Sequence, residues 1–242
     1  MIKGSVPVYI GVFFCLLLCS FAAPFLRDKI QQNQVPVVKI ITPKNGSLFD
    51  GDSQVNYQIS VVDKEDGDSK YEEINALEVL LEVNYVNNKA KIPSNKTIKA
   101  DPPGLAIIRT SNCFNCHNFN TKAIGPSFNE IATKYPATVL NIDLLAKHIK
   151  EGSVGIWGKA AMPTHPELSP EETVNAVKWI LKQAADPNVT YYTGTEGVFR
   201  TKQATGAYKK GTYVLTASYT DHGLKNSGTR LKGQDVVVLL SK

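Results

Sequence analysis

The stretch that decides the interpretation of this 242-residue chain is TSNCFNCHNF, residues 110–119. It places Cys113 and Cys116 three positions apart, and His117 directly follows the second cysteine. Three kinds of site begin with such a spacing: a redox dithiol, half of a zinc site, and the attachment point of a haem. The rest of the sequence has to decide among them.

C-x-x-C-H is the attachment pattern of c-type haem. Cysteines at positions i and i+3 present both thiols on one side of a helical turn, where they can add to the two vinyl groups of one porphyrin. The adjacent His117 can then reach the iron as its proximal ligand. We therefore expect one covalently attached haem c, bound through Cys113 and Cys116.

The two alternatives fit less well. A thioredoxin-like dithiol belongs at a helix N-terminus within a βαβ pattern, whereas this pair follows a predicted helix. Structural zinc needs four ligands. No second cysteine pair follows the N-terminal leader, and the histidines left to complete such a site are His148, His165 and His222.

Met162 is the candidate for the sixth iron ligand. It is the single methionine that remains once a leader is removed, and it lies in the Gly- and Pro-bearing segment GIWGKAAMPTHP. A lone methionine usually fills a core. A thioether held in such a loop suits an iron ligand better, so we predict that His117 and Met162 together bind the iron. We expect His165 to be a surface histidine.

The N-terminus has the layout of a secretory signal peptide covering residues 1–22. Lys3 precedes an apolar run, and small residues follow before the first later charge, Arg27. An uncleaved membrane anchor is one alternative, because the run is long enough to span a bilayer. Lipidation at Cys19 is the other. All three place the body of the protein outside the cytoplasm, in the periplasm or associated with the cell envelope, and the last two add a membrane association through the N-terminus.

Charge and cysteine content exclude some classes of protein. Two of the four cysteines lie in the leader, so a disulfide framework is not expected. Residues 187–242 carry eight Lys and Arg against three Asp and Glu, but no basic run alternates with aromatics. We therefore expect no nucleic-acid partner; a solvated surface is the first interpretation of this basic end, and a docking face the second.

Two segments alternate as β-strands do. In the first, VNYQISVV places Val55, Tyr57, Ile59 and Val61 on one face, and LEVLLEVNYV does the same for every second residue from Val79 to Tyr85. In the second, every second residue from Tyr213 to Tyr219 shares a face. The acidic turn between the first strands, Asp63–Asp68, is predicted to be a solvated loop, with calcium binding as the alternative.

Residues 101–185 show helix signals instead. Pro102 and Pro103 suit a helix start. Ser127 and Ser169 each precede a glutamate at the capping-box spacing, and a further helix is expected from Asn141 to Gly152. The helical segment thus separates the two β segments.

The helical segment resembles a class I c-type cytochrome of the small bacterial kind. The likeness rests on the C-x-x-C-H pattern, on IGPSF and GSVGIWGKAAMPTHP after it, and on the closing LSPEETVNAVKWIL. It implies that the two cysteines carry thioether bonds and that His117 and Met162 are the axial ligands. It also implies that the carbonyl group of Pro126 accepts a hydrogen bond from His117 and that Trp157 donates one to a haem propionate.

The β segments resemble PKD-type or bacterial immunoglobulin-like domains, through VVKIITPKNGSLFDGD and GTYVLTASYTDHG. We expect an α+β multidomain protein, in which an all-α class I cytochrome c domain is inserted in, or flanked by, an immunoglobulin-like β-sandwich. The expected parts are the signal peptide (1–22), the first part of the sandwich (36–98), the monohaem cytochrome domain (99–186) and the second part of the sandwich (190–242).

A haem iron with two protein ligands has no open position for a substrate, so we predict an electron carrier and not an enzyme. Its expected partners are a redox donor and acceptor, such as a secreted dehydrogenase or a terminal oxidase. Two alternatives remain. The sandwich could be a scaffold or carbohydrate- or protein-binding module, with Tyr191, Tyr192 and Tyr208 as candidate contacts, or the haem could sense a ligand if Met162 dissociates.

Overall fold

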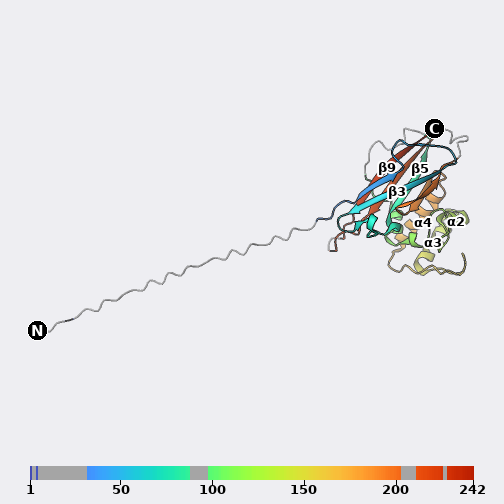
Figure 1. The fold of residues 1–242 in the computed structure, drawn as a ribbon. Helices are drawn as coiled ribbons and strands as arrows, with labels where there is room; N and C mark the ends of the chain where they lie inside the picture. Colours follow the sequence, from blue (N-terminus) through green and yellow to red (C-terminus); the bar gives the residue numbers. More distant parts are fainter. Residues whose placement is uncertain (2–3, 5–31, 88–97, 203–210, 226–227) are drawn as a thin grey trace. The chain divides into compact units, whose positions relative to one another are not determined.

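The computed structural model describes residues 1, 4, 32–87, 98–202, 211–225 and 228–242, and residues 32–242 form one unit by their contacts (Figure 1). The predicted signal peptide, with its alternatives of an anchor or a lipidated Cys19, lies outside the described residues apart from residues 1 and 4, and Tyr208 also lies outside them. A membrane-spanning helix is not found in the described parts of the chain.

The β-strands form two sheets. Sheet A has the order β1–β3–β4, with β7 also paired to β3; its strands are β1 (Val37–Thr42), β3 (Gln54–Asp63), β4 (Gly67–Asp68) and β7 (Glu196–Arg200). Sheet B has the order β2–β9–β8–β5–β6; its strands are β2 (Leu48–Phe49), β9 (Lys232–Ser241), β8 (Thr212–Thr220), β5 (Leu80–Val86) and β6 (Val189–Thr193). Strands from before and after the helical segment therefore hydrogen-bond to each other in both sheets, through β3 with β7 and β5 with both β6 and β8.

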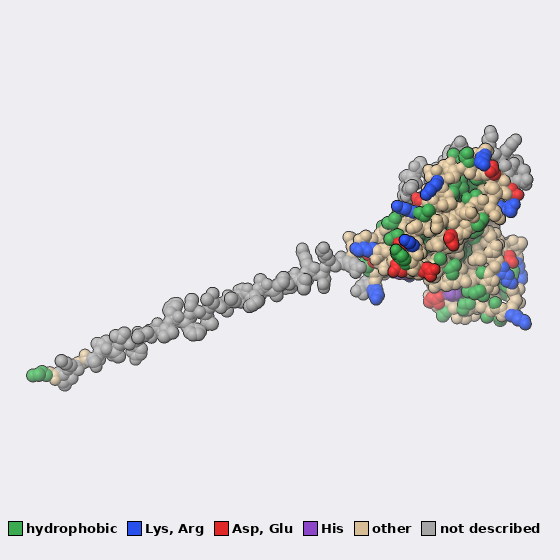
Figure 2. All heavy atoms as spheres, viewed as in Figure 1, with side chains coloured by type: hydrophobic (Ala, Val, Ile, Leu, Met, Phe, Trp, Pro, Cys, Tyr) green, Lys and Arg blue, Asp and Glu red, His purple; other side chains and the backbone are tan. Residues whose placement is uncertain are grey.

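The predicted alternation of the strands is confirmed by burial. The inward-facing residues of β3, β5 and β8 are at most 3% exposed, apart from the partly buried Val55, and they form one core between the sheets. On the face shown in Figure 2, positive and negative side chains are interspersed over the described surface.

The helices lie between β5 and β6 in the sequence. They are α1 (Pro103–Thr110), α2 (Phe128–Lys134), α3 (Val139–Glu151) and α4 (Pro170–Ala184), with the short 3₁₀ helix η4 (Cys113–Asn115) after α1. Both capping boxes are present, at Ser127 before α2 and Ser169 before α4. The predicted start of α3 at Asn141 is wrong: the helix begins two residues earlier, because Thr138 is the N-cap and its hydroxyl accepts a hydrogen bond from the Asn141 N–H.

The helices pack on the face of sheet B that points away from sheet A. Leu81 of β5 belongs to the core between the sheets, whereas its neighbour Leu80 is buried among helical side chains. Tyr191 of β6 is also buried there, against Phe119 and Trp179. Tyr191 is therefore a packing residue, and its expected alternative use as an exposed binding aromatic is wrong.

Arg109, in the last turn of α1, joins the helices to sheet B. Its guanidinium donates hydrogen bonds to Asp101 Oδ2 (3.1 Å), to the Glu78 carbonyl oxygen (3.1 Å), and to the hydroxyl (3.0 Å) and carbonyl (3.3 Å) oxygens of Ser218. The side chains of Arg109 and Asp101 are each only 9% exposed. One buried cation therefore fixes α1 against β8 and against the 3₁₀ helix η2 (Ala76–Glu78), which precedes β5.

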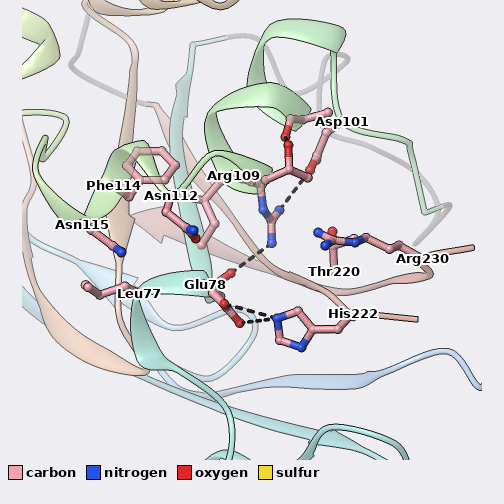
Figure 3. Close-up of a pocket in the computed structure, with 13 residues that line it drawn as sticks. Leu77, Glu78, Asp101, Arg109, Asn112, Phe114, Asn115, Thr220, His222 and Arg230 are labelled. Atoms are coloured by element: carbon pink, nitrogen blue, oxygen red, sulfur yellow. Dashed lines mark hydrogen bonds and ion pairs between the residues drawn. The ribbon is translucent and has the colours of Figure 1, made fainter. Parts of the chain in front are cut away.

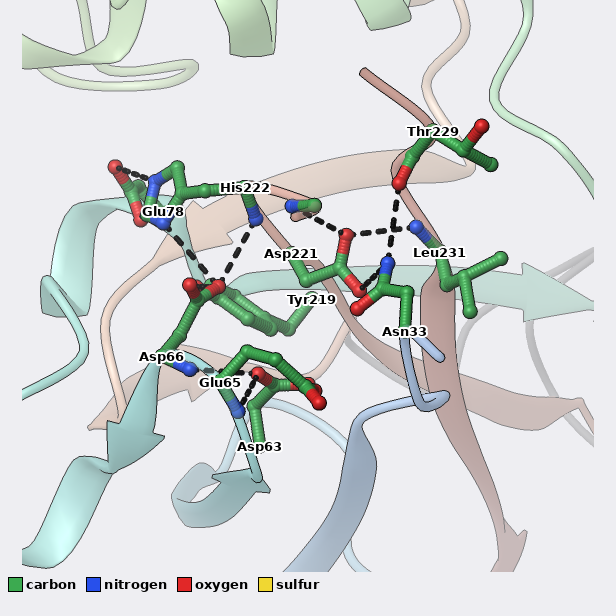
Figure 4. A network of polar contacts seen from close by, with 11 residues as sticks. Asn33, Asp63, Glu65, Asp66, Glu78, Tyr219, Asp221, His222, Thr229 and Leu231 are labelled. Atoms are coloured by element: carbon green, nitrogen blue, oxygen red, sulfur yellow. Dashed lines mark hydrogen bonds and ion pairs between the residues drawn. The ribbon is translucent and has the colours of Figure 1, made fainter. Parts of the chain in front are cut away.

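The acidic turn is not the solvated loop that the sequence suggested (Figure 4). Asp63 is 3% exposed, and its Oδ1 accepts the backbone N–H groups of Glu65 (2.9 Å) and Asp66 (2.7 Å). Asp66 Oδ2 accepts the Tyr219 hydroxyl (2.7 Å) and the His222 N–H (2.9 Å). These carboxylates hold a turn and link it to the end of β8. Within the described residues no three His, Cys, Asp or Glu side chains are grouped closely enough to hold a metal ion.

We predict that Arg109→Ala lowers the free energy of unfolding by about 3 kcal/mol, because it leaves the buried Asp101 with Lys232 as its remaining cation and takes the donor from the Glu78 and Ser218 carbonyl groups. The measurement is urea unfolding followed by circular dichroism. The control is Arg200→Ala, whose pair with Asp52 is more than half exposed on both sides and should contribute less than about 1 kcal/mol. Equal effects of the two substitutions would contradict the role given to Arg109.

A second prediction concerns the pKa of His222. Burial lowers this pKa, but the carboxylates of Glu78 and Asp66 outweigh burial, so it lies above its ordinary value of about 6.5. The ion pairs therefore stabilise the fold fully below pH ~6.5, and this contribution is lost as the pH rises through the raised pKa. We expect an NMR titration to give a His222 pKa above 6.5 that falls in Glu78→Gln; a value at or below 6.5 in the unsubstituted protein would refute the prediction.

Candidate functional site

The cysteine pair begins where α1 ends. Asn112 adopts a left-handed conformation (φ 56°) that terminates the helix, and η4 starts at Cys113. The N–H groups of Cys116 and His117 both donate to the Cys113 carbonyl oxygen, at 3.2 and 3.0 Å. The segment therefore makes one tight turn, and the junction that holds α1 against sheet B also positions the cysteines.

His117 is oriented by a hydrogen bond and by close packing. Its Nδ1 lies 2.7 Å from the Pro126 carbonyl oxygen, and its ring stacks on Phe128 with 5.7 Å between centroids and 14° between planes. Burial lowers the pKa of His117, which the bond to Pro126 offsets only in part. The imidazole is therefore neutral at physiological pH, with Nδ1–H used by Pro126 and the Nε2 lone pair available to a ligand.

Gly125 makes room for this ring. A Cβ atom at this position would lie 2.6 Å from His117 Cε1 and 2.9 Å from Nδ1, closer than side-chain atoms approach one another. The sequence indicated the importance of IGPSF only through its resemblance to cytochromes, and the packing requirement at Gly125 was missed.

The thiol of Cys113 is unsuited to dithiol redox chemistry. Burial raises its pKa to about 11, so almost none of it is thiolate at neutral pH. Reactive cysteines in C-x-x-C motifs have the opposite shift, because a helix N-terminus or a nearby cation lowers their pKa. Cys113 and Cys116 are not joined by a disulfide.

Met162 is fixed at the end of a short closed loop. Its backbone pairs with Ser153 through two hydrogen bonds, Met162 N–H to the Ser153 oxygen at 2.8 Å and Ser153 N–H to the Met162 oxygen at 3.2 Å. The loop begins at Gly152, whose φ of 81° favours glycine and whose Cα faces the Met162 oxygen. The backbone position of Met162 is thus set by this pairing.

One cavity of about 420 Å³ brings the candidate residues together. Its volume lies within the range of ordinary cofactor sites. All six residues singled out by the sequence line it: Cys113, Cys116, His117, Pro126, Trp157 and Met162. Most of the remaining wall is apolar and comes from all four helices, including Ile108, Phe128, Ile131, Leu145, Ile149 and Ile180.

This donor set fits a covalently bound haem. Two thiols, one neutral imidazole and one thioether face a single apolar cavity, which is the chemistry that a haem c with His and Met ligands requires. Trp157 stands at the wall with Lys134 Nζ 4.6 Å from its ring. Such a cavity can exclude water from an iron centre. Its opposite walls can contact the two faces of a planar cofactor.

His148 and His165 also line the cavity, which sequence reasoning missed. His165 was expected at the surface, but its side chain is only 19% exposed and its Nδ1 lies 2.9 Å from Glu167 Oε1. Its position three residues after Met162 was the available signal.

Comparisons with known proteins agree with this chemistry. The family model for cytochrome c matches residues 103–184, which are the helical segment. Cytochrome c-551 of Stutzerimonas stutzeri is 38% identical over 78 residues, covering 32% of this chain and 74% of that protein. Cytochrome c2 of Rubrivivax gelatinosus is 40% identical over 85 residues, covering 34% of this chain and 98% of that protein.

Among solved structures, the crystal structure of wild-type Nitrosomonas europaea cytochrome c552 is 35% identical. It covers 32% of this chain and 96% of that chain, with a TM-score of 0.31. The family assignment rests on the sequence identities.

We predict that Gly125→Ala reduces the fraction of protein that carries covalently bound haem and destabilises the fold by about 1–3 kcal/mol, because the added methyl group displaces the His117 ring. Haem content is measured from the absorbance of the denatured haemochrome against total protein. Gly158→Ala is the control: it adds the same methyl group in the Met162 loop, away from the cavity wall and with no atom within 4 Å, at a φ of 122° that costs about 1 kcal/mol. Haem loading that falls equally in both variants would refute the specific role of Gly125.

Proposed function

The chain belongs to the cytochrome c family through residues 103–184, and on that premise we propose that it is an exported class I electron carrier whose helices hold one His/Met-ligated haem. Members of this family bind one covalently attached haem c and carry electrons, and they are not enzymes. The observation that carries the proposal for this chain is the convergence of Cys113, Cys116, His117 and Met162 on one cavity.

Each residue has a role in this proposal. Cys113 and Cys116 would hold the haem covalently, through thioether bonds from their sulfurs to its two vinyl groups. His117 Nε2 and Met162 Sδ would be the protein's ligands to its iron, and the iron would then have no position open to oxygen or a substrate. When bound, the haem supplies a one-electron couple between ferric and ferrous iron.

The protein sets the properties of that couple. The Pro126 carbonyl oxygen holds the His117 ring and strengthens it as a donor. Met162, a weak donor to ferric iron, raises the reduction potential relative to a histidine ligand. The apolar wall disfavours the added charge of the oxidised state, which also raises the potential. Trp157 donates its indole N–H to a propionate and so compensates one negative charge at the cavity edge.

We assign a positioning role to the β part. It is an immunoglobulin-like sandwich of the PKD type, formed by residues 36–98 together with 190–242, and it holds the cytochrome domain of residues 99–186 beside a redox partner. That partner is a secreted dehydrogenase or a terminal oxidase outside the cytoplasm. The shared core of α1, α4, β5 and β6 supports this role, because it makes the orientation of the haem relative to the sheets rigid.

We predict that the ferric protein shows a low-spin spectrum with a weak far-red band from Met–iron charge transfer, and that Met162→Ala loses this band while it retains covalent haem. The measurement is an optical spectrum of protein matured in a host with haem-attachment machinery. Val154→Ala is the control, because it truncates an exposed apolar residue of the same loop and leaves the sulfur in place.

A protein without haem would refute the proposal. A high-spin spectrum that Met162→Ala does not change would keep the haem but favour the ligand-sensing alternative, since the sixth position would then be open.

A further inference from the structure

A second cavity, of about 200 Å³, lies where the helices meet sheet B (Figure 3). We call it the junction cleft. Its walls come from α1, η4, the 3₁₀ helix η2 (Ala76–Glu78) and the segment between β8 and β9. Asn112 and Asn115, on either side of Cys113, line both the junction cleft and the haem cavity. The residues that directly precede Cys113 and Cys116 in the sequence therefore form part of the cleft wall.

The acidic groups of the junction cleft are already compensated. Asp101 is paired with Arg109 at 3.1 Å and also with Lys232, and Glu78 is paired with His222 at 3.3 Å. Arg230 also lines the cleft, and no ion pair or hydrogen bond joins its guanidinium to another described residue. Glu78 shares His222 with Asp66, so the guanidinium of Arg230 is the one cation among the described residues of the cleft wall that has no carboxylate partner.

Hydrogen-bond donors face this charge across the cleft. Thr220 Oγ1 is buried without a hydrogen-bond partner among the described residues, and it lies beside Arg230, opposite the amides of Asn112 and Asn115 (Figure 3). A guanidinium accompanied by hydroxyl and amide donors is the chemistry that recognises a carboxylate, because arginine can bind both carboxylate oxygens at once.

We propose that the junction cleft receives an acidic side chain of the protein that exchanges electrons with the haem; this inference rests on the proposed electron-carrier function. The size of the cleft favours a single side chain over a free small molecule, since it is smaller than the usual 300–1,000 Å³ of ligand pockets. The exposed apolar residues Leu77, at the cleft, and Ile124, at the haem cavity, extend the surface on either side.

The proposal gives the β part a direct role in partner selection. Electron-transfer interfaces are small and short-lived, so a single well-placed charge pair influences both orientation and association rate. Arg230 is supplied by the segment between β8 and β9, whereas the electron leaves through the helical part. A partner that contacts both Arg230 and the helical part would distinguish this protein from a cytochrome made of the helical part alone.

The test uses the full chain with haem bound and two small redox probes of opposite charge. Reduction of the ferric protein by hexacyanoferrate(II) and by hexaammineruthenium(II) is followed by stopped-flow absorbance over a range of ionic strengths. The variants are Arg230→Glu, Lys159→Glu at an exposed position of the Met162 loop, and Lys39→Glu on the outer face of sheet A as a remote control. All three reverse one positive charge.

We expect Arg230→Glu to slow reduction by the anionic probe about tenfold at low ionic strength and to speed reduction by the cationic probe, with both effects vanishing at high salt. Lys39→Glu should change either rate less than twofold. The proposal is overturned if the Arg230→Glu and Lys39→Glu variants are reduced at equal rates, or if only Lys159→Glu changes the rates of reduction. Partners would then approach the haem cavity and not the junction cleft. Unsubstituted protein without bound haem would overturn the electron-carrier function itself, so the two failures are distinguishable.

Discussion

The buried contact of Arg109 is the constraint on which much of this structure depends. The side chain lies at the end of α1, immediately before the turn that carries the cysteines, and it binds η2 through Glu78, β8 through Ser218, and Asp101. A displacement of α1 would leave those groups without donors in a low-dielectric environment. The cysteine turn, the wall that Ile108 contributes to the haem cavity and the junction cleft all take their positions from this contact.

The helical segment connects two strands that are neighbours in sheet B. β5 and β6 are antiparallel and directly paired, from Leu80 with Thr193 to Asn84 with Val189. A long connection between adjacent strands adds little to the free energy of loop closure, because that cost rises only with the logarithm of length. The inserted segment also closes on itself, since α1 packs against α4. The sheet and the helices can therefore share a core without distorting one another.

Features set by local chemistry could be predicted from the sequence. The spacing of Cys113, Cys116 and His117 and the capping boxes at Ser127 and Ser169 depend on residues a few positions apart, and the strand faces follow from a period of two. What was missed depends on contacts distant in the sequence. Arg109 meets Ser218, 109 residues away, and Asp66 meets Tyr219, 153 residues away. No local pattern reports such pairs, which is also why the acidic turn was mistaken for a solvated loop.

The pairing of β3 with β7 and of β5 with β8 means that each of these strand pairs is complete only after the helical segment has been synthesised. A chain that emerges from its N-terminus presents β3 before β7, and β5 before β6 and β8, and the cysteine pair lies between these early strands and their later partners. Sheet B cannot be completed until the residues after the helical segment have followed. The turn that carries the cysteine pair thus precedes, along the sequence, the strands that complete sheet B beside it.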